Sequence, residues 1–198
     1  MKNIILIPIV LFTIMCKAQT PIKSLYDDRM ETQGAYYKDI YNDLNHFEGT
    51  WIYTDGTTSL TIVLQKKEMQ FSDYGVGDIQ VYEDALIGEY QYIENGVEKI
   101  NTLNNLLVNY TDYYNYNIAG SSIIKAATTP PDDCVSCSAT DIRVNLSFSD
   151  PERSIFGYEP EMIFRHYTEN GVEKLRLNFR TRSGPKKGLN GEENEFDE

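Results

Sequence analysis

The feature that most constrains this chain is a segment of eight residues that occurs twice, each time around an Asn-Gly pair. Residues 92–99 read YIENGVEK and residues 167–174 read YTENGVEK, so the two copies differ at one position. Asn and Gly tolerate the positive φ angles that a type I′ turn between antiparallel strands requires. The sequence therefore predicts two β-hairpins and an antiparallel β architecture, while the repeat itself indicates no activity.

Alternation of apolar and polar residues predicts the strands around these turns. In the last hairpin, the turn places Phe164 opposite Leu177 on a face that is expected to be buried. His166 and Leu175 form the next pair on the same face. Further strands are expected at residues 50–54, 59–66, 79–82, 85–94, 97–102, 117–125 and 142–148.

One short helix is expected before the first hairpin. Between Ala35 and Phe47, the residues Tyr36, Ile40 and Leu44 recur at helical spacing, which is typical of an amphipathic helix. The predicted fold class is therefore mostly β, an antiparallel meander that forms a barrel or a strongly curved sheet, with one short N-terminal helix.

The start of the chain has the order of a secretory signal. Residues 1–18 contain a charged start, an apolar core too short to span a bilayer, and small residues before Gln19. We expect export to the periplasm or the extracellular space, with a lipid anchor at Cys16 disfavoured because bulky Met15 precedes it. The predicted organisation is a signal peptide at 1–18, a flexible lead at 19–33, one β domain at 34–182 and a disordered polar tail at 183–198.

The net charge of the chain excludes some classes of binding partner. The chain has 18 basic and 30 acidic residues and a formal net charge of -12. A protein with this balance repels nucleic acid and anionic lipid surfaces at long range. We therefore expect no nucleic-acid partner, and no transmembrane segment in the mature chain.

Two cysteines remain after the predicted cleavage. Cys134 and Cys137 are expected to form a disulfide, because exported proteins keep close cysteine pairs oxidised. So short a loop adds about 2 kcal/mol in the chain-entropy model. The same spacing occurs in thiol oxidoreductases and metal sites, but the βαβ context and a second ligand pair are missing from the sequence. A local clamp is the favoured interpretation, and no metal is expected.

The sequence contains no recognisable catalytic constellation. His46 and His166 have no partner at ligand spacing, and Ser121 and Ser122 are not part of a Gly-x-Ser-x-Gly elbow. No phosphate-binding or calcium-binding loop pattern occurs. We therefore predict a protein that is not an enzyme and needs no cofactor.

The step from Phe47 to Tyr53 contains Gly-Thr-Trp, with Trp51 at the start of the first long strand. This resembles the opening of lipocalin-type barrels, and Thr111-Asp112-Tyr113 matches the second lipocalin motif. The whole chain is similar to an uncharacterised family of small secreted bacterial proteins with a lipocalin-like build. The resemblance implies a lipocalin-like barrel or strongly curved sheet and export, and it implies no activity.

Binding is the predicted function. A small apolar or amphipathic ligand would lie between Trp51, the strand of Leu60 and the face of Phe164, since barrel mouths favour ligand sites. The alternative is a structural or protein-interaction component of the bacterial envelope or secretome. Tyrosines combine an apolar ring with a polar tip, so a cluster of them is a second candidate recognition surface. This cluster consists of Tyr110, Tyr113, Tyr114 and Tyr116.

Two arginines form a candidate anion contact. Arg165 and Arg176 are expected to lie opposite each other in the last hairpin, where like charges cost roughly 0.2 to 1 kcal/mol. Such a placement suits an anionic ligand. Neutralisation by Glu161, Glu173 and solvent is the favoured alternative, because exposed charges interact weakly.

Overall fold

The structure is a computed structural model that describes residues 20–28, 31–75, 79–125, 137, 141–153 and 159–181. The described residues form one sheet of ten strands and three short 3-10 helices, so the fold is mostly β, as predicted. The elements are β1 (Ile22–Ser24), β2 (Tyr36–Lys38), η1 (Asp43–Phe47), β3 (Gly49–Asp55), β4 (Thr58–Asp73), β5 (Gln80–Glu94), β6 (Val97–Asn101), η2 (Leu103–Leu107), η3 (Tyr113–Asn115), β7 (Ile118–Lys125), β8 (Ile142–Phe148), β9 (Pro160–Glu169) and β10 (Val172–Thr181).

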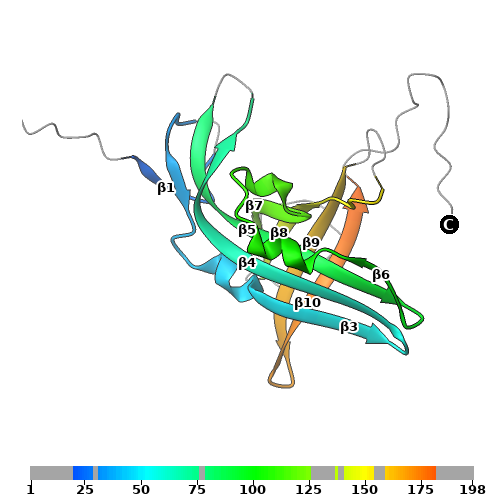
Figure 1. The fold of residues 1–198 in the computed structure, drawn as a ribbon. Helices are drawn as coiled ribbons and strands as arrows, with labels where there is room; N and C mark the ends of the chain where they lie inside the picture. The colour runs from blue at the N-terminus through cyan, green and yellow to red at the C-terminus, as the bar shows by residue number, and fades with distance from the viewer. Residues whose placement is uncertain are drawn as a thin grey trace, which may run out of the picture.

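The long strand β5 is the centre of the sheet (Figure 1). One of its edges pairs with β4 from Gln80 to Ile93, and β4 in turn pairs with β3. Its other edge pairs first with β2, then with β7 and finally with β6. From β7 the sheet continues through β8 and β9 to β10. Two groups of strands therefore diverge from β5.

Both predicted Asn-Gly hairpins are confirmed, and so is the predicted register of the last one. Asn95 and Gly96 have φ angles of 51° and 77°, and Asn170 and Gly171 have φ angles of 54° and 76°. These positive values are those of type I′ turns. In the last hairpin the turn sets every pair, with Phe164 opposite Leu177 and His166 opposite Leu175.

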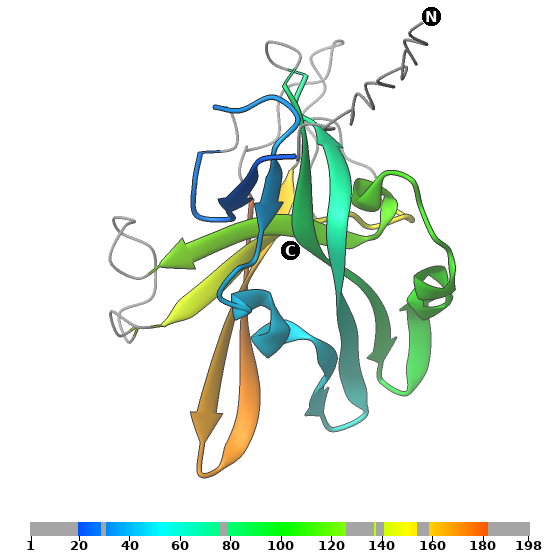
Figure 2. The same cartoon turned by 90° about the vertical axis from the view of Figure 1, so that its left-hand side faces the viewer.

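The sheet is not closed into a barrel, so that alternative of the predicted fold class is wrong. Among the described strands, β3 pairs only with β4 and β10 only with β9. The sheet nevertheless bends over itself, because the Trp51 ring of β3 lies 6.1 Å from the His166 ring of β9. Side chains of β3 and β9 are therefore in contact, but the backbone edges of β3 and β10 do not pair with each other. Figure 2 shows the tips of the β3–β4 and β9–β10 hairpins separated from each other.

The predicted N-terminal helix over residues 35–47 is also wrong. This segment contains the strand β2 and the 3-10 helix η1, separated by Asn42 with a φ angle of 58°. A left-handed residue ends any continuous α-helix at that point. The apolar spacing was nevertheless informative, because Tyr36 and Leu44 are buried, whereas Ile40 is 47% exposed.

Both faces of β5 are covered, which explains why its sequence does not alternate clearly. Leu86 and Tyr90 belong to the main core inside the bend of the sheet. Ala85 and Ile87 point to the opposite face, where a smaller second core lies beneath the segment that contains η2 and η3. A strand buried on both faces shows a nearly continuous apolar run.

Several predicted features fall outside the described residues. These are the signal peptide at 1–18, the tail at 183–198 and Cys134, so cleavage and the disulfide stay predictions. Residues 22–24, within the segment predicted as a flexible lead, form β1 in parallel with β2. Within the described part of the chain, no helix has both the length and the apolar character needed to cross a membrane.

Candidate functional site

The free edges of β3 and β10 border an open hollow of about 740 Å³, which we call the first hollow. Apolar side chains form most of its wall, and three charged residues lie at its margin: Glu48, Glu173 and Lys174. Trp51, Leu60 and Phe164, the residues between which the sequence predicts a ligand, all line it. The other apolar or aromatic residues of its wall are Ile52, Tyr53, Ile62, Tyr167, Val172, Leu175 and Leu177.

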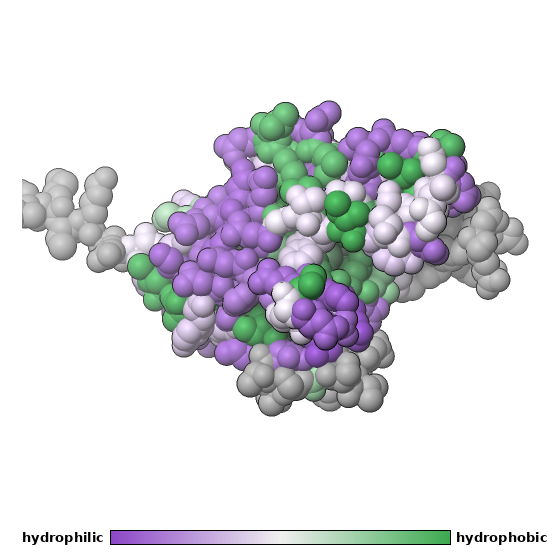
Figure 3. All heavy atoms as spheres, turned by 90° about the horizontal axis from the view of Figure 1, so that it is seen from below, coloured by the Kyte–Doolittle hydropathy of each residue, from purple (hydrophilic) through white to green (hydrophobic). Residues whose placement is uncertain are grey.

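A second hollow of about 880 Å³ adjoins the first, because Leu60 and Leu177 line both. Aromatic and aliphatic residues form its wall, and charged residues form its margin. The wall also contains Tyr90, Tyr92, Ile100, Phe148, Met162 and Phe179, and the margin contains Glu94, Lys99, Asp150, Glu152 and Arg153. We call the two hollows together the concave face. Seen from below in Figure 3, apolar side chains gather in the middle of the molecule and hydrophilic ones surround them.

Two histidines stack near Trp51, one of the residues that line the first hollow. The rings of His46 and His166 lie 5.5 Å apart at an angle of 23°. The rings of Phe47 and Trp51 contact His166 edge-on, at 6.4 Å and 6.1 Å. Trp51 is fixed in turn by its Nε1, which donates a hydrogen bond of 2.9 Å to the carbonyl of Phe47. This aromatic cluster joins η1 to β3 and β9.

Protonation of His166 is expected to destabilise the fold. Burial lowers the pKa of His166 below its ordinary value of 6.5, His46 lowers it further, and Glu173 raises it in part. The histidine of the unfolded chain therefore binds a proton at a higher pH than His166 of the folded chain does. The free energy of unfolding is unaffected by this difference above pH 6.5 and decreases as the pH falls below that value. Between pH 7.5 and 5.5, the free energy of unfolding in urea should fall more for the natural protein than for His166→Gln. Equal slopes for the two proteins would contradict this assignment.

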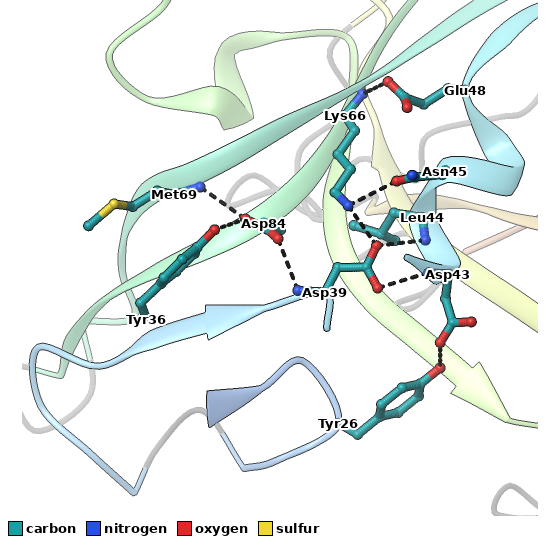
Figure 4. A network of polar contacts seen from close by, with 10 residues as sticks. All are labelled: Tyr26, Tyr36, Asp39, Asp43, Leu44, Asn45, Glu48, Lys66, Met69 and Asp84. Carbon is teal, nitrogen blue, oxygen red and sulfur yellow. Dashed lines mark hydrogen bonds and ion pairs between the residues drawn. The ribbon is translucent and has the colours of Figure 1, made fainter. Parts of the chain in front are cut away.

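A network of buried carboxylates lies on the other side of η1 (Figure 4). Asp84 accepts hydrogen bonds from the Tyr36 hydroxyl and from the backbone N–H groups of Asp39 and Met69. Lys66 Nζ lies 2.9 Å from Asp39 Oδ2. Asp39 also accepts from the N–H groups of Asp43 and Leu44, and Asp43 accepts from Tyr26.

This network is a structural element rather than a reactive site. Each of the three carboxylates has a donor, and within the described ranges no group of three or more His, Cys, Asp or Glu side chains could hold a metal ion. Its bonds join the segment before β3 to β4 and β5. The bonds of the network are therefore ones that hold the fold together, and the concave face is the candidate site.

The tyrosine cluster lies away from Trp51, on the opposite face of β5. Tyr113 and Tyr116 are buried in the second core, and Tyr110 packs edge-on against Tyr116 at 4.8 Å. Tyr114 is 48% exposed. The structure therefore does not combine Trp51 and the tyrosines in one site, and ligand binding by the tyrosines stays a prediction.

Two carboxylates lie buried beneath this cluster. Glu83 accepts hydrogen bonds from the hydroxyls of Tyr74, Tyr113 and Ser121. Glu89 accepts from the N–H of Asn117 at 3.1 Å. Burial raises the pKa of Glu89, and hydrogen bonds offset part of that rise. These acids hold the loop over the second core.

The arginines lie as the hairpin register predicts. Arg165 is opposite Arg176, and Arg143 of β8 is the next residue in the same row. Sequence reasoning missed Asp141, whose Oδ2 lies 2.5 Å from Nη2 of Arg165. Both arginines of the hairpin also lie near the Tyr167 ring, at 5.9 Å and 5.7 Å. Anion binding by Arg165 and Arg176 stays a prediction, and Arg165 already forms an ion pair with the carboxylate of Asp141.

The fold and the site define a mostly β protein with an open, bent sheet and two adjoining hollows that are lined by apolar side chains and open to solvent. The chain belongs to a family of unknown function, DUF6705, which it matches over residues 1–196. No curated protein and no solved structure matches the chain. The family membership therefore brings no activity, and a functional assignment depends on the concave face.

Proposed function

We propose that this protein is a non-catalytic binding protein that holds a small apolar or amphipathic ligand on its concave face. The supporting observation is the pair of adjoining hollows, about 740 and 880 Å³ in volume, beside the main core. Ligand pockets in proteins have volumes of roughly 300 to 1,000 Å³ and are lined mainly by apolar and aromatic side chains with a few polar groups. The wall and margin of the concave face match that composition.

The walls of the hollows come from strands that the sheet already holds in place. Leu60 lies on β4, which pairs along most of its length with β3 and β5. Leu177 lies on β10, whose ten residues all pair with β9. A ligand between these strands would bury apolar surface at about 25 cal/mol per Å² without first ordering the site.

The proposal includes export. Residues 1–18 have the composition of a secretory signal, which supports a location outside the cytosol, in the periplasm or beyond. The ligand would then be a molecule that the protein meets there. The binding experiment should therefore use protein recovered from the exported fraction, whose N-terminal sequence is expected to begin at Gln19.

The test is binding of the uncharged fluorescent probe N-phenyl-1-naphthylamine. We expect saturable binding, and a loss of affinity of about tenfold or more in Leu177→Arg, because this change puts a cation where the two hollows meet. Leu107→Arg is the matched control, since Leu107 is 87% exposed on η2 and lines neither hollow. Circular dichroism checks that both variants are folded.

Two results would contradict the proposal: no binding by the natural protein, or equal binding by Leu177→Arg.

The second candidate function, interaction with another protein, rests on the unpaired edge strands. Ile52 and Tyr53 of β3 are 66% and 62% exposed, and Val172 of β10 is 58% exposed. Exposed apolar edges of this kind can add a strand from a partner. Absence of probe binding together with self-association in sedimentation would favour that function.

A further inference from the structure

Tyr90 differs from the other buried tyrosines in its hydroxyl group. Tyr36 donates to Asp84, Tyr113 to Glu83, and Tyr37 and Tyr116 to backbone carbonyls. Tyr90 is only 5% exposed, yet its hydroxyl makes no hydrogen bond to any residue in the described part of the chain. The hydroxyl oxygen is not one of the buried side-chain atoms that lack a partner, so it lies where solvent can reach it and supply a hydrogen bond.

Tyr90 lies at the second hollow, where its hydroxyl is open to a ligand. Its ring lines the second hollow and packs against Phe148 at 5.2 Å, and Phe148 packs against Phe179 at 5.4 Å. The hydroxyl is within electrostatic range of Asp150 and Glu152, which belong to the margin of the same hollow. The phenol therefore has its ring among the apolar residues of the wall and its oxygen toward the mouth.

The charges at the mouth decide what kind of group could meet this hydroxyl. Burial raises the pKa of Tyr90, and Asp150 adds to the rise, so the phenol is a neutral hydrogen-bond donor at physiological pH. Lys99 lies 3.4 Å from Glu94, which leaves one cation, Arg153, beside two carboxylates. An anionic group at this position would lose water next to two like charges, which is costly.

We propose that the second hollow binds an uncharged amphipathic molecule whose oxygen accepts a hydrogen bond from Tyr90. A ketone, ester or alcohol oxygen would meet the phenol, and the hydrocarbon part would lie along Phe148, Phe179 and Leu177. Long-chain carboxylates are excluded at neutral pH by Asp150 and Glu152. This inference rests on the proposed function and assigns a ligand class to it.

The experiment compares decan-2-one and decanoate as competitors of N-phenyl-1-naphthylamine at pH 7.5. The natural protein should bind the ketone at least tenfold more tightly than the carboxylate. Tyr90→Phe, which removes only the hydroxyl, should weaken ketone binding about fivefold, as expected for one hydrogen bond. The same variant should bind the naphthylamine probe as the natural protein does, since the probe has no acceptor oxygen.

Tyr41→Phe is the matched control, because Tyr41 is 63% exposed and lines neither hollow. It should leave ketone binding unchanged. A structural role for the Tyr90 hydroxyl would lower the melting temperature of Tyr90→Phe, whereas we expect no decrease, because no hydrogen bond to the described residues is lost. A decrease would overturn the inference even if ketone binding weakened.

The failure of this inference can be told apart from failure of the proposed function. Probe binding that Leu177→Arg abolishes, together with equal ketone affinity in the natural protein and Tyr90→Phe, would overturn the inference and leave the proposed function standing. Decanoate binding as tight as ketone binding would do the same. Absence of probe binding by the natural protein would overturn both.

Discussion

Replacement of Gly88 with valine is expected to destabilise the fold by about 3 kcal/mol or more. Gly88 lies in β5 where β4 pairs on one side and β7 on the other, opposite Leu64 and Ile118. A Cβ atom built on Gly88 would lie 2.5 Å from Cδ2 of Leu64 and 2.8 Å from the carbonyl oxygen of Val63. The leucine side chain could rotate, but the carbonyl belongs to the backbone of β4, so the strand itself would have to move.

Urea unfolding followed by the fluorescence of Trp51 measures this effect. Gly88→Ala should be destabilised less than Gly88→Val, since both carry the Cβ but only valine adds two methyl groups. Thr54→Val is the control, because Thr54 is an exposed residue of β3, where substitutions change stability by about 0.5 kcal/mol or less. An unfolding midpoint of Gly88→Val equal to that of the natural protein would contradict the close packing of β4, β5 and β7.

The last hairpin could be predicted in full because its two-residue turn fixes the register of every pair that follows it, whereas a register shift between Tyr92 and Ile93 interrupts the hairpin of β5 and β6. Once Asn170 and Gly171 are at the corner, the position of Phe164 opposite Leu177 is a matter of counting. Closure of the sheet had no such local determinant. It depends on how the second edge of β5 is shared among β2, β7 and β6, which are distant from one another in the chain.

The segment 35–47 shows why a short apolar stripe is ambiguous. Spacings of three and four residues fit one face of an α-helix, but a strand followed by a 3-10 helix buries Tyr36, Leu44 and Phe47 equally well. The deciding contacts are distant in sequence: Tyr36 pairs with Ile22 on one side and Tyr82 on the other. No local pattern could reveal them.

Part of the candidate site could be predicted from the sequence, because alternation of apolar and polar residues is a local pattern. Trp51, Leu60 and Phe164 lie on strands whose inner faces could be identified from alternation, and the structure brings all three to the first hollow. The second hollow needs Tyr90 of β5 to contact Phe148 of β8 across the bend of the sheet, although β7 lies between these strands, and no motif indicates this contact. The position of Tyr90 at the second hollow becomes visible only when Asp150 and its neighbours are placed around it.

Replacement of Lys66 with methionine is expected to cost about 3 kcal/mol of folding free energy. The side chains of Lys66 and Asp39 are 9% and 1% exposed, and their charged groups lie 2.9 Å apart. Methionine keeps much of the aliphatic stem but removes the ammonium group, so the carboxylate of Asp39 stays buried without its cation. Two N–H donors, from Asp43 and Leu44, remain to it.

Urea unfolding should show that this buried ion pair contributes more to the free energy of unfolding than an exposed ion pair does. Lys99→Met is the matched control, since Lys99 and Glu94 are 49% and 45% exposed, and its effect should be about 0.5 kcal/mol or less. Adding Asp39→Asn to Lys66→Met should recover part of the loss, because the uncompensated charge is then gone. Equal effects of Lys66→Met and Lys99→Met would show that the buried pair contributes little.

The Lys66 variant also tests whether the polar network supports the concave face. Asp39 holds the start of η1 through two hydrogen bonds, and η1 carries His46 and Phe47. Both contact His166, which packs against Trp51 of the first hollow. Loss of the ion pair should therefore loosen η1 and weaken binding of the naphthylamine probe, although Lys66 lines neither hollow. Unchanged probe affinity in a folded but destabilised Lys66→Met protein would mean that the walls formed by β3, β4 and β10 hold the site without support from η1.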